Sequence, residues 1–361
     1  MSALFQPFKL KDVTLRNRIG VPPMCQYSAV DGMVTGWHRG HLAGLARGGA
    51  GLVVVEATAV SPEGRITPGC TGLWNDAQVE GMALAAKIIK AAGAVPGIQL
   101  GHAGRKASAN RPWEGDNHIA DGDPRGWQTI APSALAFGAH LPKVPREMTL
   151  ADIARVRDDF AAAARRAREA GFEWLELHFA HGYLAQSFFS PNANQRTDAY
   201  GGSFDNRARF LRETLAAVRA VWPERLPLTL RFGVVEFDGR EEQTLAEAIE
   251  LVRHFKTDGL DLLSVSAAFT TPTAKIPWGQ PGFMVPFAER VRREVDIPVA
   301  TAWGLGDPLL AERVVAEQRI DLALIGKPHL ANPHWTYAAA LALNIDKPAW
   351  VLPAPYAHWL S

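Results

Sequence analysis

Residues 228–258, LTLRFGVVEFDGREEQTLAEAIELVRHFKTD, contain a short apolar run and then a helical pattern. The run Leu228–Phe232 has the length and composition of a parallel strand that is buried on both faces. The helical pattern extends from Gln243 to Asp258. A strand followed by a helix is the repeating unit of an α/β fold.

The same unit occurs eight times along the 361 residues. Strands are predicted at Arg18–Pro22, Leu52–Glu56, Pro96–Leu100, Trp174–His178, Leu228–Phe232, Asp261–Val265, Pro298–Ala302 and Asp321–Gly326. Helices are predicted at Trp37–Arg47, Asp76–Ala92, Thr149–Ala170, Phe204–Val221, Gln243–Asp258, Val285–Val295, Pro308–Gln318 and Pro333–Leu343. Eight alternations predict an α/β fold of the closed TIM (β/α)8 barrel type, formed by a single domain over 1–361.

Two of the predicted helices carry start signals of their own. Thr149 offers a capping hydroxyl to the helix that stops near Gly171. Asp307 precedes Pro308, and proline is favoured at the first position of a helix. Both signals are in phase with the predicted strands, which supports the barrel.

Two segments depart from the strand–helix rhythm. Residues 101–148 are rich in Gly, Pro, Asn, Asp and Trp, and the barrel pattern resumes directly after them. They are interpreted as a long capping loop excursion after strand 3 over the barrel mouth. The C-terminal tail 350–361, WVLPAPYAHWLS, is more apolar than a disordered end. It is predicted to dock at a subunit interface.

The composition argues against several classes of protein. The 38 basic and 37 acidic residues leave a formal charge of +1, which provides no field of one sign for nucleic acid or an anionic membrane. Neither a signal peptide nor an apolar stretch of roughly 20 residues is present. Cys25 and Cys70 are too few for a disulfide scaffold or an iron–sulfur cluster. A cytoplasmic protein without nucleic-acid or membrane partners is expected.

Active sites of TIM barrels lie at the carboxyl ends of the strands. These ends are rich in hydrogen-bond donors and contain almost no carboxylates, whereas a metal-dependent hydrolase needs hard oxygen ligands or several converging imidazoles. The pairs His178/His181 and His38/His41 have a spacing that permits zinc, but no third ligand is obvious. No metal site is predicted, and a metal-dependent barrel hydrolase remains the less favoured alternative.

His178, His181 and Tyr183 predict hydrogen-bond and proton-transfer chemistry. The two histidines leave one strand end a turn apart, so both could donate to a single oxygen and stabilise an enolate. Tyr183 could supply a proton to the carbon next to that carbonyl. The alternative is a satisfied pair of core histidines.

Arg231 and the last two strand ends predict a phosphorylated ring as ligand. Arg231 ends the fifth strand, where a permanent cation would stabilise negative charge on a ring; its alternative is an ion pair with a core carboxylate. Ala302–Gly306 and Gly326–Pro328 place glycines and backbone amides beside a short helix start, as in the phosphate site of barrel enzymes. These residues suit a phosphorylated flavin without excluding a sugar phosphate.

One long stretch is specific to a family. The run Glu176–Glu213, ELHFAHGYLAQSFFSPNANQRTDAYGGSFDNRARFLRE, resembles the signature of the old yellow enzyme family. LRNRI (15–19), PPMCQYSA (22–29), QLGHAGRKA (99–107) and LANP (330–333) extend the resemblance over nearly the whole chain. Many members have threonine where this chain has Cys25. In this position the chain is similar to a bacterial, cysteine-containing subgroup.

The resemblance implies an FMN cofactor with NADPH or NADH as hydride donor. It implies that FMN is held by Pro23, Met24, Cys25, Ala57, Gln99, His178, Arg231, Ala302, Trp303, Gly304, Gly326 and Lys327. The catalytic residues that it implies are His178, His181, Tyr183 and Cys25, and the substrate pocket would contain Tyr27, His178, His181, Tyr183, Trp303 and Trp359. Trp359 would come from a partner subunit of a homodimer or higher homo-oligomer.

The implied reaction is NAD(P)H-driven reduction of activated C=C bonds by ping-pong hydride transfer through FMN. Enones, enals, maleimides and nitroalkenes, and also nitrate esters or nitroaromatics, present an oxygen that the two histidines could hold. The family usually has arginine where this chain has Lys327, which predicts weaker retention of the FMN phosphate. Another FMN-barrel oxidoreductase and a non-catalytic flavin protein remain alternatives.

Overall fold

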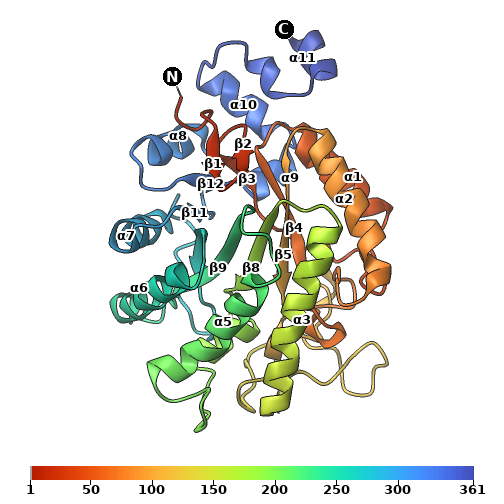
Figure 1. The fold of residues 1–361 in the computed structure, drawn as a ribbon, viewed down its shortest axis with the longest axis vertical. Coiled ribbons are helices and arrows are strands. Elements are labelled where there is room, and N and C mark those ends of the chain that lie inside the picture. Colours follow the sequence, from red (N-terminus) through yellow and green to blue (C-terminus); the bar gives the residue numbers. More distant parts are fainter. Residues whose placement is uncertain (1) are drawn as a thin grey trace.

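The parallel strands close into a barrel in the computed structural model, which describes residues 2–361 (Figure 1). Their order around the barrel is β10-β11-β12-β3-β4-β5-β8-β9, which follows the chain. The strands are β3 (Ile19–Val21), β4 (Leu52–Ala59), β5 (Val95–Gly101), β8 (Trp174–Phe179), β9 (Leu228–Val235), β10 (Leu262–Ala267), β11 (Val299–Thr301) and β12 (Leu322–Leu324). All eight predicted strands are present, so the TIM barrel is confirmed.

Helices surround the barrel and connect successive strands (Figure 1). They are α1 (Gly36–Arg47), α2 (Val79–Ala91), α3 (Leu150–Glu169), α5 (Phe204–Arg219), α6 (Glu241–Thr257), α7 (Val285–Val295), α8 (Pro308–Ala316) and α10 (Trp335–Ala342). Each corresponds to a predicted helix, with ends that differ by a few residues; the predicted start at Asp76 is instead a 3₁₀ turn, Asp76–Gln78. The short helix α9 (Lys327–Ala331) begins at the predicted short helix start, whereas two other short helices were not predicted: α4 (Leu184–Phe189) and α11 (Ala354–Leu360).

Both predicted helix caps are present. The Thr149 hydroxyl accepts a hydrogen bond from the Asp152 N–H at 3.1 Å, and the Asp152 carboxylate accepts one from the Thr149 N–H at 2.8 Å. The Asp307 carboxylate accepts from the Leu309 N–H at 3.0 Å. Such caps satisfy N–H groups that have no partner inside the helix.

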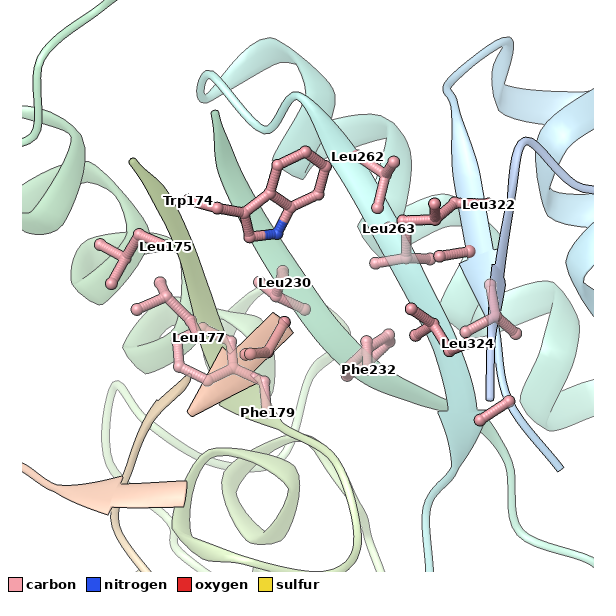
Figure 2. Close-up of a cluster of buried hydrophobic side chains, with 14 of the residues drawn as sticks. Trp174, Leu175, Leu177, Phe179, Leu230, Phe232, Leu262, Leu263, Leu322 and Leu324 are labelled. Carbon is pink, nitrogen blue, oxygen red and sulfur yellow. The ribbon is translucent and has the colours of Figure 1, made fainter. Parts of the chain in front are cut away.

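Strand alternation divides each strand between the helical layer and the barrel interior. Leu177 and Phe179 of β8 belong to the buried apolar cluster in Figure 2, and Phe179 meets Phe160 of α3 edge-on at a centroid distance of 6.0 Å. The side chain of His178 points to the opposite face of β8 from those of Leu177 and Phe179, and His178 pairs in register with Arg231 of β9. Polar side chains therefore enter the barrel interior at its carboxyl end.

The segment 101–148 follows β5 and contains two short strands, β6 (Ile130–Ala131) and β7 (Arg146–Glu147). Its side chains bond to loops at the carboxyl ends of the barrel strands. The Arg111 Nε donates to the Tyr27 carbonyl at 2.9 Å, and the Arg105 Nη2 donates to the Thr270 carbonyl at 2.6 Å. These contacts tie the excursion to the barrel mouth.

The chain termini lie at the other end of the barrel. The hairpin of β1 (Phe8–Leu10) and β2 (Val13–Leu15) and the helix α11 both lie at the end of the molecule away from the excursion (Figure 1). In α11, Ala357 is buried, whereas Trp359 is 83% exposed. Within the described chain, no helix is long and apolar enough to span a bilayer.

Candidate active site

His178, His181 and Tyr183 form one cluster at the carboxyl end of β8. His178 lies in the strand, His181 in the following loop, and Tyr183 directly precedes α4. The ring centroids of His178 and His181 are 4.9 Å apart, and so are those of His178 and Tyr183, with nearly perpendicular planes in both pairs. The structure thus brings together the three side chains for which the sequence predicted hydrogen-bond and proton-transfer chemistry.

The two imidazoles are neutral near pH 7. Burial holds the pKa of both rings well below the usual histidine range, and the positive charge of Arg231 lowers the pKa further. The Ala180 N–H donates to Nδ1 of His178 at 3.3 Å, so the proton of this neutral ring lies on Nε2. His178 therefore keeps a free N–H donor.

Ser266 of β10 holds the second imidazole. Its Oγ lies 2.8 Å from Nε2 of His181, and Nε1 of Trp303 donates to the same oxygen at 3.2 Å. Ser266 is fully buried. Ser266 is not among the residues predicted from the sequence, because its contact with His181 crosses 85 positions of the chain.

Tyr183 and Cys25 are both protonated near neutral pH. Burial raises the pKa of the Tyr183 phenol well above its usual value, so the phenol is a proton donor. Burial also raises the pKa of the Cys25 thiol, and nearby Cys70 and Glu56 raise it further. A thiol kept in its neutral form is a weak nucleophile.

Arg231 is buried at the barrel mouth. The alternative interpretation of this arginine was an ion pair with a core carboxylate, and the structure shows no close pair of this kind within residues 2–361. In the part of the chain that the structure describes, its Nε has no hydrogen-bond partner. Glu176, two residues before His178 on the same face of β8, attracts Arg231 but bonds to Nε2 of Gln99 at 2.7 Å. Sequence reading missed this carboxylate because Glu176 lies inside the strand and not at its end.

The last two strands end in the expected glycine-containing turns. Trp303 and Gly304 follow β11 with φ of 70° and 71°, and a Cβ on Gly304 would lie 2.7 Å from the backbone nitrogen of Gly282. Gly326 precedes α9, and Lys327 is the exposed first residue of that helix. Backbone N–H groups at such a helix start favour a phosphate.

The remaining predicted residues lie on the first two strands and their loops. Pro23, Met24 and Tyr27 follow β3, and Tyr27 has a left-handed backbone with φ of 49°. Ala57 lies inside β4, which is longer than predicted and continues to Ala59. These residues border the same mouth, whereas Trp359 of the tail does not join them.

A phosphorylated flavin fits this donor set. The buried Arg231 Nε without a partner suits the electron-rich end of a flavin ring, and the turn before α9 suits its phosphate. In the part of the chain that the structure describes, no three His, Cys, Asp or Glu side chains are grouped to hold a metal. His38, one of the histidines considered for zinc, accepts from the Thr35 N–H and faces Glu56.

Comparison with known proteins decides the family. Residues 3–345 match the NADH:flavin oxidoreductase / NADH oxidase family. The chain belongs to this family, the old yellow enzyme family. This old yellow enzyme is 42% identical to an NADPH dehydrogenase of Geobacillus sp. (strain WCH70) over 94% of both chains.

Solved structures agree with this assignment. Morphinone reductase in complex with tetrahydroNAD is 28% identical, with a TM-score of 0.78 over 94% of this chain and 90% of that one. The old yellow enzyme homologue of Zymomonas mobilis is 25% identical, with a TM-score of 0.77 over 95% and 93% of the two chains. The protein is therefore an FMN-dependent oxidoreductase that takes hydride from NAD(P)H and reduces activated C=C bonds.

Proposed function

We propose that this enzyme reduces α,β-unsaturated carbonyl compounds and nitroalkenes, with His178 and His181 holding the substrate oxygen and Tyr183 donating the proton. The observation that carries the proposal is the cluster itself: two neutral imidazoles and a protonated phenol at the end of one strand. Enals, enones and maleimides share the required oxygen, and nitrate esters or nitroaromatics are further candidates.

The histidines act as a pair of donors. Nε2 of His178 carries the ring proton, because Nδ1 accepts from the Ala180 N–H. Nε1 of Trp303 donates to Oγ of Ser266. We propose that the Ser266 hydroxyl donates in turn to Nε2 of His181, with the proton of that ring on Nδ1. Two N–H groups converging on one oxygen stabilise the enolate that develops when the β-carbon accepts hydride.

Tyr183 completes the reaction on the carbon side. Its raised pKa keeps the phenol protonated until a carbanion-like α-carbon is present. Tyr27 and Trp303 border the pocket and restrict the orientation of the substrate. Cys25, a neutral thiol, tunes the flavin instead of attacking the substrate.

FMN, when bound, accepts hydride from the nicotinamide and delivers hydride to the substrate. We propose that it is held by Pro23, Met24, Cys25, Ala57, Gln99, His178, Arg231, Ala302, Trp303, Gly304, Gly326 and Lys327. Arg231 stabilises negative charge on the ring. Gln99 donates to Glu176 through its amide nitrogen, which leaves the amide oxygen free to accept from the ring.

We further propose a homodimer or higher homo-oligomer in which the C-terminal tail completes the partner's pocket. Trp359 is 83% exposed and stands at the end of the barrel away from its own mouth. We propose that the chain is similar to the bacterial subgroup that includes xenobiotic reductase A, which the cysteine at position 25 and the aromatic tail support. We also propose a cytoplasmic location, where thiols such as Cys25 and Cys70 stay free.

A visible absorption spectrum of the purified protein tests the function. We expect an oxidised flavin spectrum, anaerobic bleaching by NADPH, and recovery of the spectrum when 2-cyclohexenone is added. Cyclohexanone, which lacks the C=C bond, is the control and should leave the flavin bleached. Recovery with both ketones or with neither would contradict the proposal.

A further inference from the structure

We propose that Lys106 is a positioning residue for this reaction, acting through His181. The proposal rests on the function proposed above for His181. Lys106 ends the 3₁₀ turn Gly104–Lys106 after β5, at the start of the 101–148 excursion. Its Nζ donates to the carbonyl oxygens of His181 and Phe269, both at 2.8 Å. The ammonium therefore joins the loop after β8 to the loop after β10.

Both carbonyls belong to residues in an unfavourable backbone conformation. His181 has a φ of 62° and Phe269 a φ of 51°, in the left-handed region where the Cβ of an L-residue crowds the following carbonyl oxygen. Such residues persist only where surrounding contacts determine their conformation. The two hydrogen bonds from Lys106 supply that contact at both positions.

The residue after His181 shows how closely the two loops approach. Gly182 has a φ of 67°, and a Cβ at this position would lie 2.2 Å from the Phe269 carbonyl oxygen and 2.9 Å from Nζ of Lys106. Both carbonyl oxygens accept a hydrogen bond from the same Nζ of Lys106, and the absence of a side chain at Gly182 leaves space for this amine.

The consequence for the active site concerns the orientation of one imidazole. Ser266 fixes the His181 ring at Nε2, while Lys106 fixes the peptide that carries the ring. His178 lies within a barrel strand and its peptide has no contact with Lys106. Loss of the ammonium should therefore misplace His181 and leave His178 in position.

The charge of Lys106 adds to its geometric effect. Burial and the neighbouring Arg105 lower its pKa to about 7, while Glu236 and Asp116 raise it. When protonated, Lys106 also contributes to the low pKa of His178 and His181. A pKa of about 7 leaves part of the amine neutral near neutral pH, and the neutral amine still has the two N–H groups that the carbonyls of His181 and Phe269 accept.

The test compares Lys106→Met with Lys256→Met. Nζ of Lys256 bridges the carbonyls of Val295 and Asp296 at 3.0 and 2.6 Å, and Asp296 is also left-handed with φ of 54°. This second lysine contacts the C-terminal end of α7, away from the mouth. Both variants remove a lysine that bridges two carbonyl oxygens, and urea unfolding measures the loss of conformational stability in each, so that a change of rate can be compared with a change of stability.

The measured quantity is the rate at which 2-cyclohexenone reoxidises the reduced flavin. Lys106→Met should lower this rate roughly tenfold to hundredfold, because a displacement of a catalytic group by about 1 Å has such an effect. Lys256→Met should leave the rate unchanged, and Lys106→Arg should recover most of it. If Lys106→Met does not fold, Lys106→Gln, which keeps an N–H donor, replaces it.

A double-mutant cycle separates positioning from general destabilisation. Lys106→Met should add nothing to the loss caused by His181→Ala, but it should add fully to the loss caused by His178→Ala. Additive losses of reoxidation rate in both backgrounds, or equal losses of this rate for the Lys106 and Lys256 variants, would overturn the proposal.

A crystal structure of Lys106→Met gives a readout that is independent of enone turnover. We expect the His181 peptide to leave the left-handed region while His178 keeps its position. An unchanged His181 backbone contradicts the role of Lys106. If the wild type itself is not reoxidised by 2-cyclohexenone, the proposed function fails, and this structure still decides the role of Lys106 in holding His181.

Discussion

Polar side chains reach the barrel mouth in two different ways. His178 and Arg231 stand on barrel strands, where alternation and register determine their direction. His181 and Trp303 stand on loops, with φ of 62° and 70°. A strand residue is held by the whole sheet, whereas a left-handed loop residue needs dedicated contacts, such as that of Ser266 with both rings. The mouth thus combines donors fixed by the fold with donors fixed by a few side chains.

Removing both kinds of donor gives the largest expected effect. His178→Ala combined with His181→Ala should lower enone turnover by at least about two to three orders of magnitude, because the developing enolate loses both hydrogen bonds. FMN should remain bound. The measurements are steady-state kinetics with 2-cyclohexenone and the flavin content of the purified protein.

The single variants then compare the strand-borne donor with the loop-borne one. Each should account for a large part of the loss, and His254→Ala on the outer helix α6 serves as the control. Near wild-type turnover in the double variant would end the assignment of the two histidines.

The same distinction explains how much of the molecule the sequence predicts. Strand and helix patterns are local and repeat eight times, so the barrel and its caps at Thr149 and Asp307 follow from them. The strand-end rule then places His178 and Arg231 at the mouth. Contacts between loops depend on tertiary structure, so the roles of Lys106 and Ser266 have no signal in residue spacing.

The C-terminal tail belongs to neither the barrel strands nor the loops of the mouth. Its residue Trp359 is proposed to complete the pocket of a partner subunit. Trp359→Ala should change the ratio of kcat/KM between a bulky and a small enone about tenfold, since a large side chain in a pocket wall discriminates by roughly 1–3 kcal/mol. Flavin binding should not change. Trp350→Ala, exposed in the same tail, is the matched control.

Subunit exchange shows whether Trp359 acts across the interface. Hybrid dimers of the His178/His181 variant and the Trp359→Ala variant contain one intact pocket when the tail acts in trans, and this pocket should have wild-type selectivity. Selectivity that stays at the Trp359→Ala value, after mass spectrometry confirms exchange, would place the tail on its own barrel.

Cys25 lies in the loop after β3, and its substitution is expected to change the reaction rates less than the changes above. Cys25→Ser should change the rates of the two half-reactions by less than about tenfold, because a neutral thiol tunes the flavin and a hydroxyl cannot replace an essential thiolate. Stopped-flow measurement of flavin reduction and reoxidation, together with the flavin potential, checks this. Complete loss of activity with a normal flavin content would show that the sulfur takes part in the chemistry.

The substitution of Lys327 is expected to have the smallest effect, because this side chain is exposed at the start of a short helix. A lysine meets a phosphate as a point charge, whereas arginine offers two parallel N–H groups to two oxygens. Lys327→Arg should therefore strengthen FMN binding by about 1 kcal/mol at most, or roughly fivefold in Kd. Fluorescence titration of the apoprotein with FMN measures this change, with Lys9→Arg in the β1–β2 hairpin as the control. If Kd stays the same or rises, the main chain around Gly326 holds the phosphate and the side chain at position 327 is not the limiting contact.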